Sequence, residues 1–252
     1  MSLKPRSRWQ ASALHLAISV LIGLGVLLVM LELWYPTPLF EAAGGNGLLF
    51  LVVGVDVVIG PLITLVIFAP GKPGLKLDLS VIAALQTAAL AYGVHIVYLA
   101  HPAYLVFVKD RFEVATPVDL APAELARARF AEFKRVPLGA PEFVASDFPT
   151  DPQERNALVK AALSGLDVQN FPRYWVPYAQ RTKEVLAKAE TIEQLRKSDP
   201  EVAKAVDGYL ARSQTPAASV RYLGLRAREA WVAVLVDPKT ARPLKMLIAQ
   251  KL

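Results

Sequence analysis

Asp56 occupies the most unusual position for a residue that could do chemistry, because it lies inside an apolar stretch that runs from residue 48 to residue 68. An unpaired carboxylate is costly in nonpolar surroundings, so it is expected to be paired or neutralised. If residues 48–68 and 79–99 form helices, Asp56 lies about 12 Å from the end of its helix, and Tyr92 lies at a similar depth in the other. The sequence therefore predicts a hydrogen bond from the Tyr92 hydroxyl to Asp56.

Two further irregularities lie close to Asp56. Pro61 follows Gly60 and has no amide hydrogen, so it leaves the carbonyl of Val57 without its helical donor and predicts a kink. Gln86 carries an amide that is a candidate donor for this carbonyl. Asp78 begins the next apolar stretch, and we interpret it as the N-cap of a helix, where a carboxylate is favoured by free amides and by the helix dipole.

These polar residues have three possible roles. Contacts that hold the helices together are the simplest, since polar side chains often form hydrogen bonds between membrane helices. A docking face for the membrane helix of a partner is the second. A proton or ion path is the least favoured, because the single carboxylate of Asp56 is too little for a relay.

Two residue types that are frequent in catalytic and metal sites, Cys and His, are absent or scarce, although Ser–Lys or paired-carboxylate chemistry is not excluded by composition. The chain has no Cys, and its three His residues, His15, His95 and His101, lie within the apolar stretches or at their edge. The sequence contains no P-loop, no dinucleotide-binding fingerprint after a strand and no zinc-protease motif. We therefore expect a protein that is not an enzyme, with no catalytic residues, no metal site and no cofactor.

Three apolar stretches determine the organisation of the N-terminal part. They cover residues 11–33, 48–68 and 79–99. At 1.5 Å per helical residue each is roughly 31–35 Å long, which is enough to cross a hydrocarbon core of about 30 Å. The sequence predicts a three-helix transmembrane domain over residues 1–100, in contact with membrane lipid. The first stretch resembles a signal peptide in its basic start, but it is longer than the usual apolar region of one, so we expect a retained anchor.

The orientation follows from the basic residues of the short connections. Lys4, Arg6 and Arg8 precede the first stretch, and Lys72 and Lys76 lie between the second and third, whereas residues 34–47 contain no Lys or Arg. Basic segments resist translocation, which predicts a cytoplasmic N-terminus and, after three crossings, a C-terminal domain in the periplasm. The expected location is the bacterial inner membrane.

Residues 101–252 have the size and charged composition of one globular domain. The sequence predicts an α+β domain with a small antiparallel sheet. The expected strands cover residues 103–108, 220–226, 230–236 and 244–248, and the expected helices cover residues 122–136, 177–189 and 191–197 and two segments that begin after Asp151 and Asp199. Charges of both signs are scattered over this part, which argues against nucleic-acid binding.

Arg111 and Phe112 are the residues of this domain that we would test first for a partner-binding role. The simpler interpretation, which we favour, is that Phe112 fills the core while Arg111 makes a surface ion pair.

The motifs together resemble those of the TfpX/TfpZ-type type IV pilin accessory proteins. An Asp-x-x-x-Gly-Pro run at residues 56–61 and an Asp-Arg-Phe-Glu-Val run at residues 110–114 are the most specific of them. The likeness extends over residues 55–68, 76–79, 81–86, 89–93, 104–114, 171–178 and 231–247. One departure is His101-Pro102, where the family would be expected to have Arg-Pro.

The resemblance implies an inner-membrane accessory protein, similar to a pilin-specific chaperone, that supports the stability or assembly of a type IV major pilin. It implies no catalysis. A membrane-tethered envelope enzyme, or an envelope interaction protein with no pilin role, is the alternative.

Overall fold

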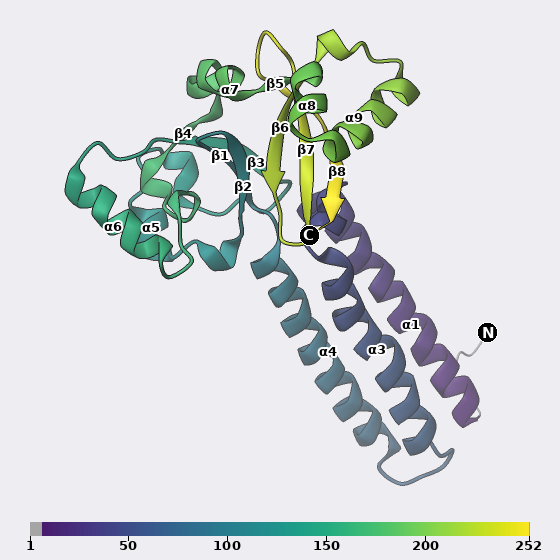
Figure 1. Cartoon of the computed structure of the whole chain (residues 1–252). Coiled ribbons are helices and arrows are strands. Elements are labelled where there is room, and N and C mark those ends of the chain that lie inside the picture. Colours follow the sequence, from purple (N-terminus) through teal and green to yellow (C-terminus); the bar gives the residue numbers. More distant parts are fainter. Residues whose placement is uncertain (1–6, 252) are drawn as a thin grey trace. The chain divides into compact units, whose positions relative to one another are not determined.

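A computed structural model describes residues 7–251 and divides them into two compact units (Figure 1). The first unit holds residues 7–32 and Gly45–Leu99, and the second holds Leu33–Gly44 together with residues 100–251. The connection between the first two apolar helices therefore belongs with the C-terminal part of the chain. This division differs from a simple boundary between residues 100 and 101.

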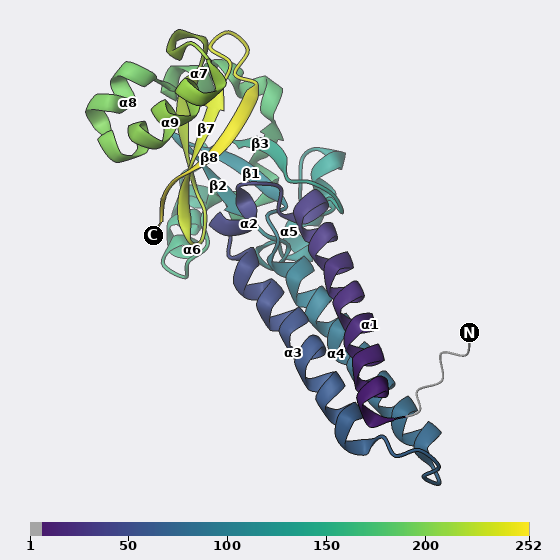
Figure 2. The ribbon, with the colours of Figure 1, turned by 90° about the vertical axis from the view of Figure 1, so that its right-hand side faces the viewer.

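Three long helices form the first unit (Figure 2). They are α1 (Arg8–Val29), α3 (Gly45–Ile67) and α4 (Leu75–Ala100), and α1 continues into a π-helical turn, η1 (Met30–Trp34). With η1 included, all three are long and apolar enough to cross a membrane. Their bounds enclose most of each predicted apolar stretch.

α1 packs closely on α3, and small side chains make this possible. Gly23 of α1 faces Val53 of α3 so closely that a Cβ at this position would meet the valine methyl group. Near the other end of α1, the Ser12 hydroxyl donates to the Pro61 carbonyl at 2.9 Å, and His15 Nδ1 shares a 2.6 Å hydrogen bond with the Thr64 hydroxyl. Polar side chains thus join α1 to α3 at the level of Pro61.

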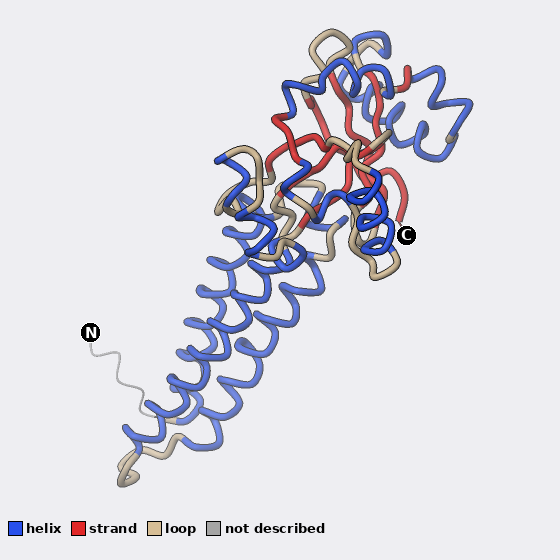
Figure 3. Tube along the Cα trace, turned by 90° about the vertical axis from the view of Figure 1, so that its left-hand side faces the viewer, coloured by secondary structure: helices blue, strands red, loops and turns tan. Residues whose placement is uncertain are grey.

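The second unit contains all the strands that the structure describes (Figure 3). They form one eight-stranded sheet in the order β4-β3-β1-β2-β6-β7-β8, and β5 pairs with β6. The strands are β1 (Tyr104–Val108), β2 (Arg111–Ala115), β3 (Glu142–Ser146), β4 (Trp175–Pro177), β5 (Glu190–Thr191), β6 (Arg221–Arg226), β7 (Ala230–Val236) and β8 (Pro243–Lys251).

The prediction of three apolar helices followed by an α+β domain is confirmed, and the structure refines the predicted small antiparallel sheet to a larger sheet in which most pairs are antiparallel and two are parallel. β1 pairs with β3 in parallel, and so does β2 with β6, so the sheet is mixed. The β1–β2 hairpin lies at the centre and pairs on each side with a strand from much further along the chain. Such long-range pairing has no local signal comparable to the turn of a hairpin.

Six helices of the second unit lie in the order α2 (Leu39–Ala42), α5 (Pro122–Ala126), α6 (Pro152–Ala162), α7 (Thr182–Lys188), α8 (Ile192–Ser198) and α9 (Pro200–Ser213). The expected caps of α6 and α9 are confirmed. Asp151 accepts a hydrogen bond from the Gln153 amide at 2.7 Å, and Asp199 accepts one from the Val202 amide at 3.1 Å.

Two predicted helices are shorter than expected. The helix predicted over residues 122–136 ends after one turn as α5, and a 3-10 turn, η3 (Ala131–Lys134), follows it. The break allows Ala128 and Phe133 to enter the same core cluster beneath the sheet. The segment predicted as a helix over residues 177–189 begins as a 3-10 turn, η6 (Tyr178–Arg181), before α7.

The short helix α2 is a structural part of the sheet domain. Leu39 and Ala42 are fully buried in its largest core cluster, and the Glu229 amide donates to the Ala42 carbonyl at 2.8 Å. Trp34 donates from its indole to the Leu138 carbonyl at 3.2 Å and stacks on the buried His101 ring. The connection between two apolar helices is thereby anchored to the sheet.

Candidate functional site

The structure pairs Asp56 with Gln86 rather than with Tyr92. Gln86 Nε2 on α4 donates to Asp56 Oδ1 on α3 at 3.2 Å. The predicted Tyr92–Asp56 hydrogen bond is wrong: among the described residues Asp56 accepts from Gln86, and the Tyr92 side chain is 67% exposed in the protein alone. Among the described residues the carboxylate therefore has a neutral amide as its partner.

Gly60 provides the space for this pair. A Cβ at Gly60 would overlap the side-chain amide of Gln86, so no larger residue fits here without movement. We predicted that Gln86 would donate to the Val57 carbonyl near Pro61; its hydrogen bond to Asp56 replaces that expectation. The helix continues through Pro61, whose own carbonyl accepts from Ser12 of α1. Gly60 and Pro61 thus face different neighbouring helices.

An apolar groove runs beside the Asp56–Gln86 pair between α3 and α4. It has a volume of about 340 Å³, and most of its lining is aliphatic. Asp56, Gln86 and Tyr92 are the hydrogen-bonding side chains among its lining residues. Gly93 of α4 touches Val52 of α3 at the same groove. The groove therefore offers an aliphatic surface with a localised polar centre.

The N-cap role predicted for Asp78 is wrong. α4 begins at Leu75, three residues earlier, so Asp78 lies in its first turn. Its carboxylate forms a 2.7 Å ion pair with Lys72 in the preceding turn. A carboxylate in the first turn is still favoured by the helix dipole.

Arg111 and Phe112 of β2 have the structural roles that we favoured, an ion pair for Arg111 and core packing for Phe112. Phe112 is fully buried and packs edge to face against Phe107 and Phe143. Arg111 Nε donates to Glu113 Oε1 at 2.7 Å. The buried ring of Phe112 is not accessible to a partner in this conformation.

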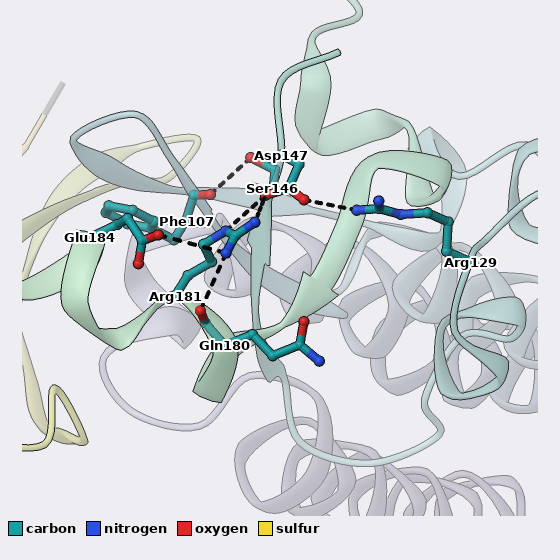
Figure 4. A network of polar contacts seen from close by, with 7 residues as sticks. All are labelled: Phe107, Arg129, Ser146, Asp147, Gln180, Arg181 and Glu184. Atoms are coloured by element: carbon teal, nitrogen blue, oxygen red, sulfur yellow. Dashed lines mark hydrogen bonds and ion pairs between the residues drawn. The ribbon is translucent and has the colours of Figure 1, made fainter. Parts of the chain in front are cut away.

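The sheet domain contains a second candidate site, centred on Asp147, which follows β3. Arg181 approaches one side of the Asp147 carboxylate through Nε at 2.8 Å and a terminal nitrogen at 2.7 Å, and Arg129 donates to the other oxygen at 2.9 Å (Figure 4). Burial raises the pKa of the Asp147 carboxyl, but the hydrogen bonds from Arg129 and Arg181 outweigh burial and bring the pKa below its ordinary value. Asp147 is therefore ionised at neutral pH.

A second pair of arginines shares Glu124 in the same region. Arg127 lies 3.1 Å and Arg173 lies 3.4 Å from Glu124 Oε1. The Arg173 guanidinium also lies 5.0 Å from the ring centres of both Phe171 and Tyr174. All four arginines line one cavity of about 600 Å³, together with Asp147, Phe148, Pro149, Thr150, Glu154 and Tyr174.

The sequence did not indicate this arginine cavity. Its lining residues come from segments between residues 127 and 181 that do not form a contiguous motif. The Phe-Pro-Arg-Tyr run at residues 171–174 contributed to the family resemblance, but nothing in its spacing connects Arg173 to Glu124 or to Asp147. Only the folding of α5, β3 and η6 around one end of the sheet brings them together.

Comparison with known proteins identifies relatives over most of the chain. The family model described as fimbrial assembly protein FimB matches residues 4–44. The fimbrial assembly protein of serogroup E1 from Dichelobacter nodosus is 31% identical over 186 residues, which cover 73% of this chain and 72% of that protein. The protein of serogroups C1 and C2 from the same organism is 33% identical over 120 residues, which cover 46% of this chain and 91% of the relative.

No solved structure matches the chain. The likeness to the serogroup E1 protein extends well beyond the apolar N-terminal segment that the family model covers. On this evidence the chain belongs to the fimbrial assembly protein family.

Proposed function

We propose that this protein is an inner-membrane accessory factor of the TfpX/TfpZ type, which supports the stability or assembly of a type IV major pilin in a chaperone-like and non-enzymatic way. Membership of the fimbrial assembly family and three helices of membrane-spanning length support the proposal. The basic residues at positions 4, 6, 8, 72 and 76 favour a cytoplasmic N-terminus and a periplasmic sheet domain.

The α3–α4 groove is the observation that carries the proposal. A partner helix in a bilayer gains little from burial of aliphatic surface alone, because the lipid is equally apolar. Close packing and a localised hydrogen bond provide the specificity instead. The groove supplies an aliphatic surface beside the Asp56–Gln86 pair, in which Asp56 has a second carboxylate oxygen and Gln86 has a carbonyl oxygen for a donor on the partner.

The first test measures the steady-state level and surface assembly of the major pilin in cells that lack this protein. We expect loss of pilin or pili, and restoration by the full chain. Normal pilin and normal pili in these cells would contradict the proposed function. The full chain is the appropriate complementing protein, because residues 33–44 pack into the sheet domain and a fragment that starts at residue 101 would lack them.

A second test examines the groove itself. A photo-crosslinking amino acid at Leu85, which lines the groove, is compared with the same group at Leu21 on α1, which does not. The two side chains are matched in exposure, at 67% and 68%. We expect a pilin adduct from position 85 and none from position 21. Equal yields, or no adduct at position 85, would contradict a role of the groove even if the cellular test succeeds.

A further inference from the structure

We propose that the arginine cavity of the sheet domain binds an acidic segment of a polypeptide, through carboxylates that take up the unused donors of Arg127 and Arg129. Assignment of that segment to a pilus subunit would rest on the proposed function, whereas the binding itself does not.

The charge arrangement carries the first step. Two carboxylates, Asp147 and Glu124, are each shared by two arginines. Four guanidinium groups therefore surround two carboxylates at the centre of the network. Glu154 at the cavity wall and Glu184 beside Arg181 add negative charge, and Lys109 and Arg155 at the Phe148–Thr150 rim add positive charge. The six basic groups named here outnumber the four carboxylates.

The accessibility of the arginines carries the second step. The Arg127 and Arg129 side chains are 55% and 51% exposed, and each donates to a carboxylate through one terminal nitrogen, so its remaining N–H groups can serve a ligand. Arg173 is largely buried between its aromatic neighbours, and Arg181 uses two nitrogens on Asp147. All four arginines thus contact the protein's own carboxylates, but Arg127 and Arg129 are the more exposed pair and keep donors for a ligand.

The walls of the cavity favour a polypeptide over an isolated small anion. Phe148, Pro149 and Tyr174 contribute apolar surface, and Thr150 contributes a hydroxyl. A volume of about 600 Å³ is large enough for several residues of an extended chain rather than a single oxyanion. Carboxylates spaced along such a chain match guanidinium groups placed at separate points, since each guanidinium can bind a carboxylate with two parallel hydrogen bonds.

The proposal is tested with the purified full chain in nanodiscs of phosphatidylcholine, titrated with a fluorescein-labelled hexaglutamate peptide. Hexaglutamine peptide is the uncharged control. The test variant is R127Q/R129Q, which leaves one arginine on each of Glu124 and Asp147. The matched variant is R196Q/R212Q on α8 and α9, which removes the same charge outside the cavity.

We expect saturable binding of hexaglutamate, no binding of hexaglutamine, and a dissociation constant at least tenfold higher for R127Q/R129Q than for R196Q/R212Q. Thermal unfolding of each variant in the same nanodiscs verifies that it is folded. If R127Q/R129Q unfolds early, the single variants R127Q and R129Q are compared with R196Q. Absence of saturable binding, or equal weakening by both double variants, overturns the proposal.

Two further arms separate a polypeptide from other anions. Competition by inorganic phosphate at concentrations similar to those of the peptide would assign the cavity to a phosphate group and overturn the polypeptide assignment. Alternatively, the protein binds phosphatidylglycerol vesicles more tightly than the peptide and loses this binding in R127Q/R129Q. That result would assign the cavity to a lipid surface and would also overturn the polypeptide assignment. If hexaglutamate binds as expected but cells that lack the protein have normal pilin, the binding site is retained and only the pilin role is rejected.

Discussion

The side-chain amide nitrogen of Gln86 on α4, Nε2, lies against the backbone of Gly60 on α3. The same Nε2 donates to Asp56, which lies one helical turn earlier on α3. The absence of a side chain at Gly60 and the presence of a carboxylate at Asp56 are therefore parts of one arrangement. α3 and α4 have few close backbone approaches, whereas α1 packs along α3. The position of α4 depends strongly on this arrangement and on the contact of Gly93 with Val52.

Gly60→Ala is expected to destabilise the helical unit, because the new Cβ would displace the Gln86 amide from Asp56. Overpacking of this kind costs about 1–3 kcal/mol. The measurement is the unfolding midpoint of the full chain in detergent micelles. Gly54→Ala on the same helix is the control, since a Cβ there meets nothing within 4 Å. A similar loss in both variants would show that space at Gly60 is not the cause.

The Asp56–Gln86 hydrogen bond is expected to appear as coupling in a double-mutant cycle. Gln86→Leu leaves the Asp56 carboxylate without its donor, so this variant should be less stable than the double variant Asp56→Leu/Gln86→Leu. Measured hydrogen bonds between membrane helices give coupling energies of about 0.6–1.7 kcal/mol. Unfolding of the four proteins in detergent measures it. Strictly additive effects would indicate that the two side chains do not interact.

Leu39→Ala is expected to destabilise the sheet domain although Leu39 lies between two apolar helices in the sequence. Its side chain is fully buried in the largest core cluster, and truncation of such a leucine costs about 2–5 kcal/mol. Leu138→Ala, in an exposed loop, provides the comparison. Near-ultraviolet circular dichroism during unfolding reports on the aromatic core of this domain. Equal stability of the two variants would contradict the assignment of α2 to the sheet domain.

Asp147 is expected to make the stability of the sheet domain depend on acid pH. Its pKa is lowered in the folded protein, so its carboxylate contributes stability that is fully present above the pKa of the unfolded chain and is lost as pH falls through the folded value. Asp147→Asn should therefore lower the unfolding midpoint at pH 7, and the difference from the natural protein should shrink below about pH 4. A difference that stays constant from pH 7 to pH 3 would mean that ionisation of Asp147 is not responsible.

Local chemistry was sufficient to predict many elements of this fold. Apolar length alone placed the three long helices, because a helix must be about 20 residues long to cross a bilayer. Asp-Pro pairs at residues 151–152 and 199–200 predicted the starts of α6 and α9, because a carboxylate caps free amides and proline fits the first turn. The apolar run at residues 231–236 predicted a strand that has neighbours on both sides.

The sequence by itself determined that Asp56 needs a partner and that Pro61 leaves a backbone carbonyl without its helical donor, because the cost of a carboxylate or a missing amide in apolar surroundings is local. Only the tertiary structure decided that Gln86, and not Tyr92, is that partner, since the rotation of α4 about its axis depends on side-chain packing along the whole helix. It also brought Arg173 to Glu124, brought Arg129 and Arg181 to Asp147, and placed α2 in the sheet core. Such contacts between residues far apart in the chain are decided by the packing of complete elements.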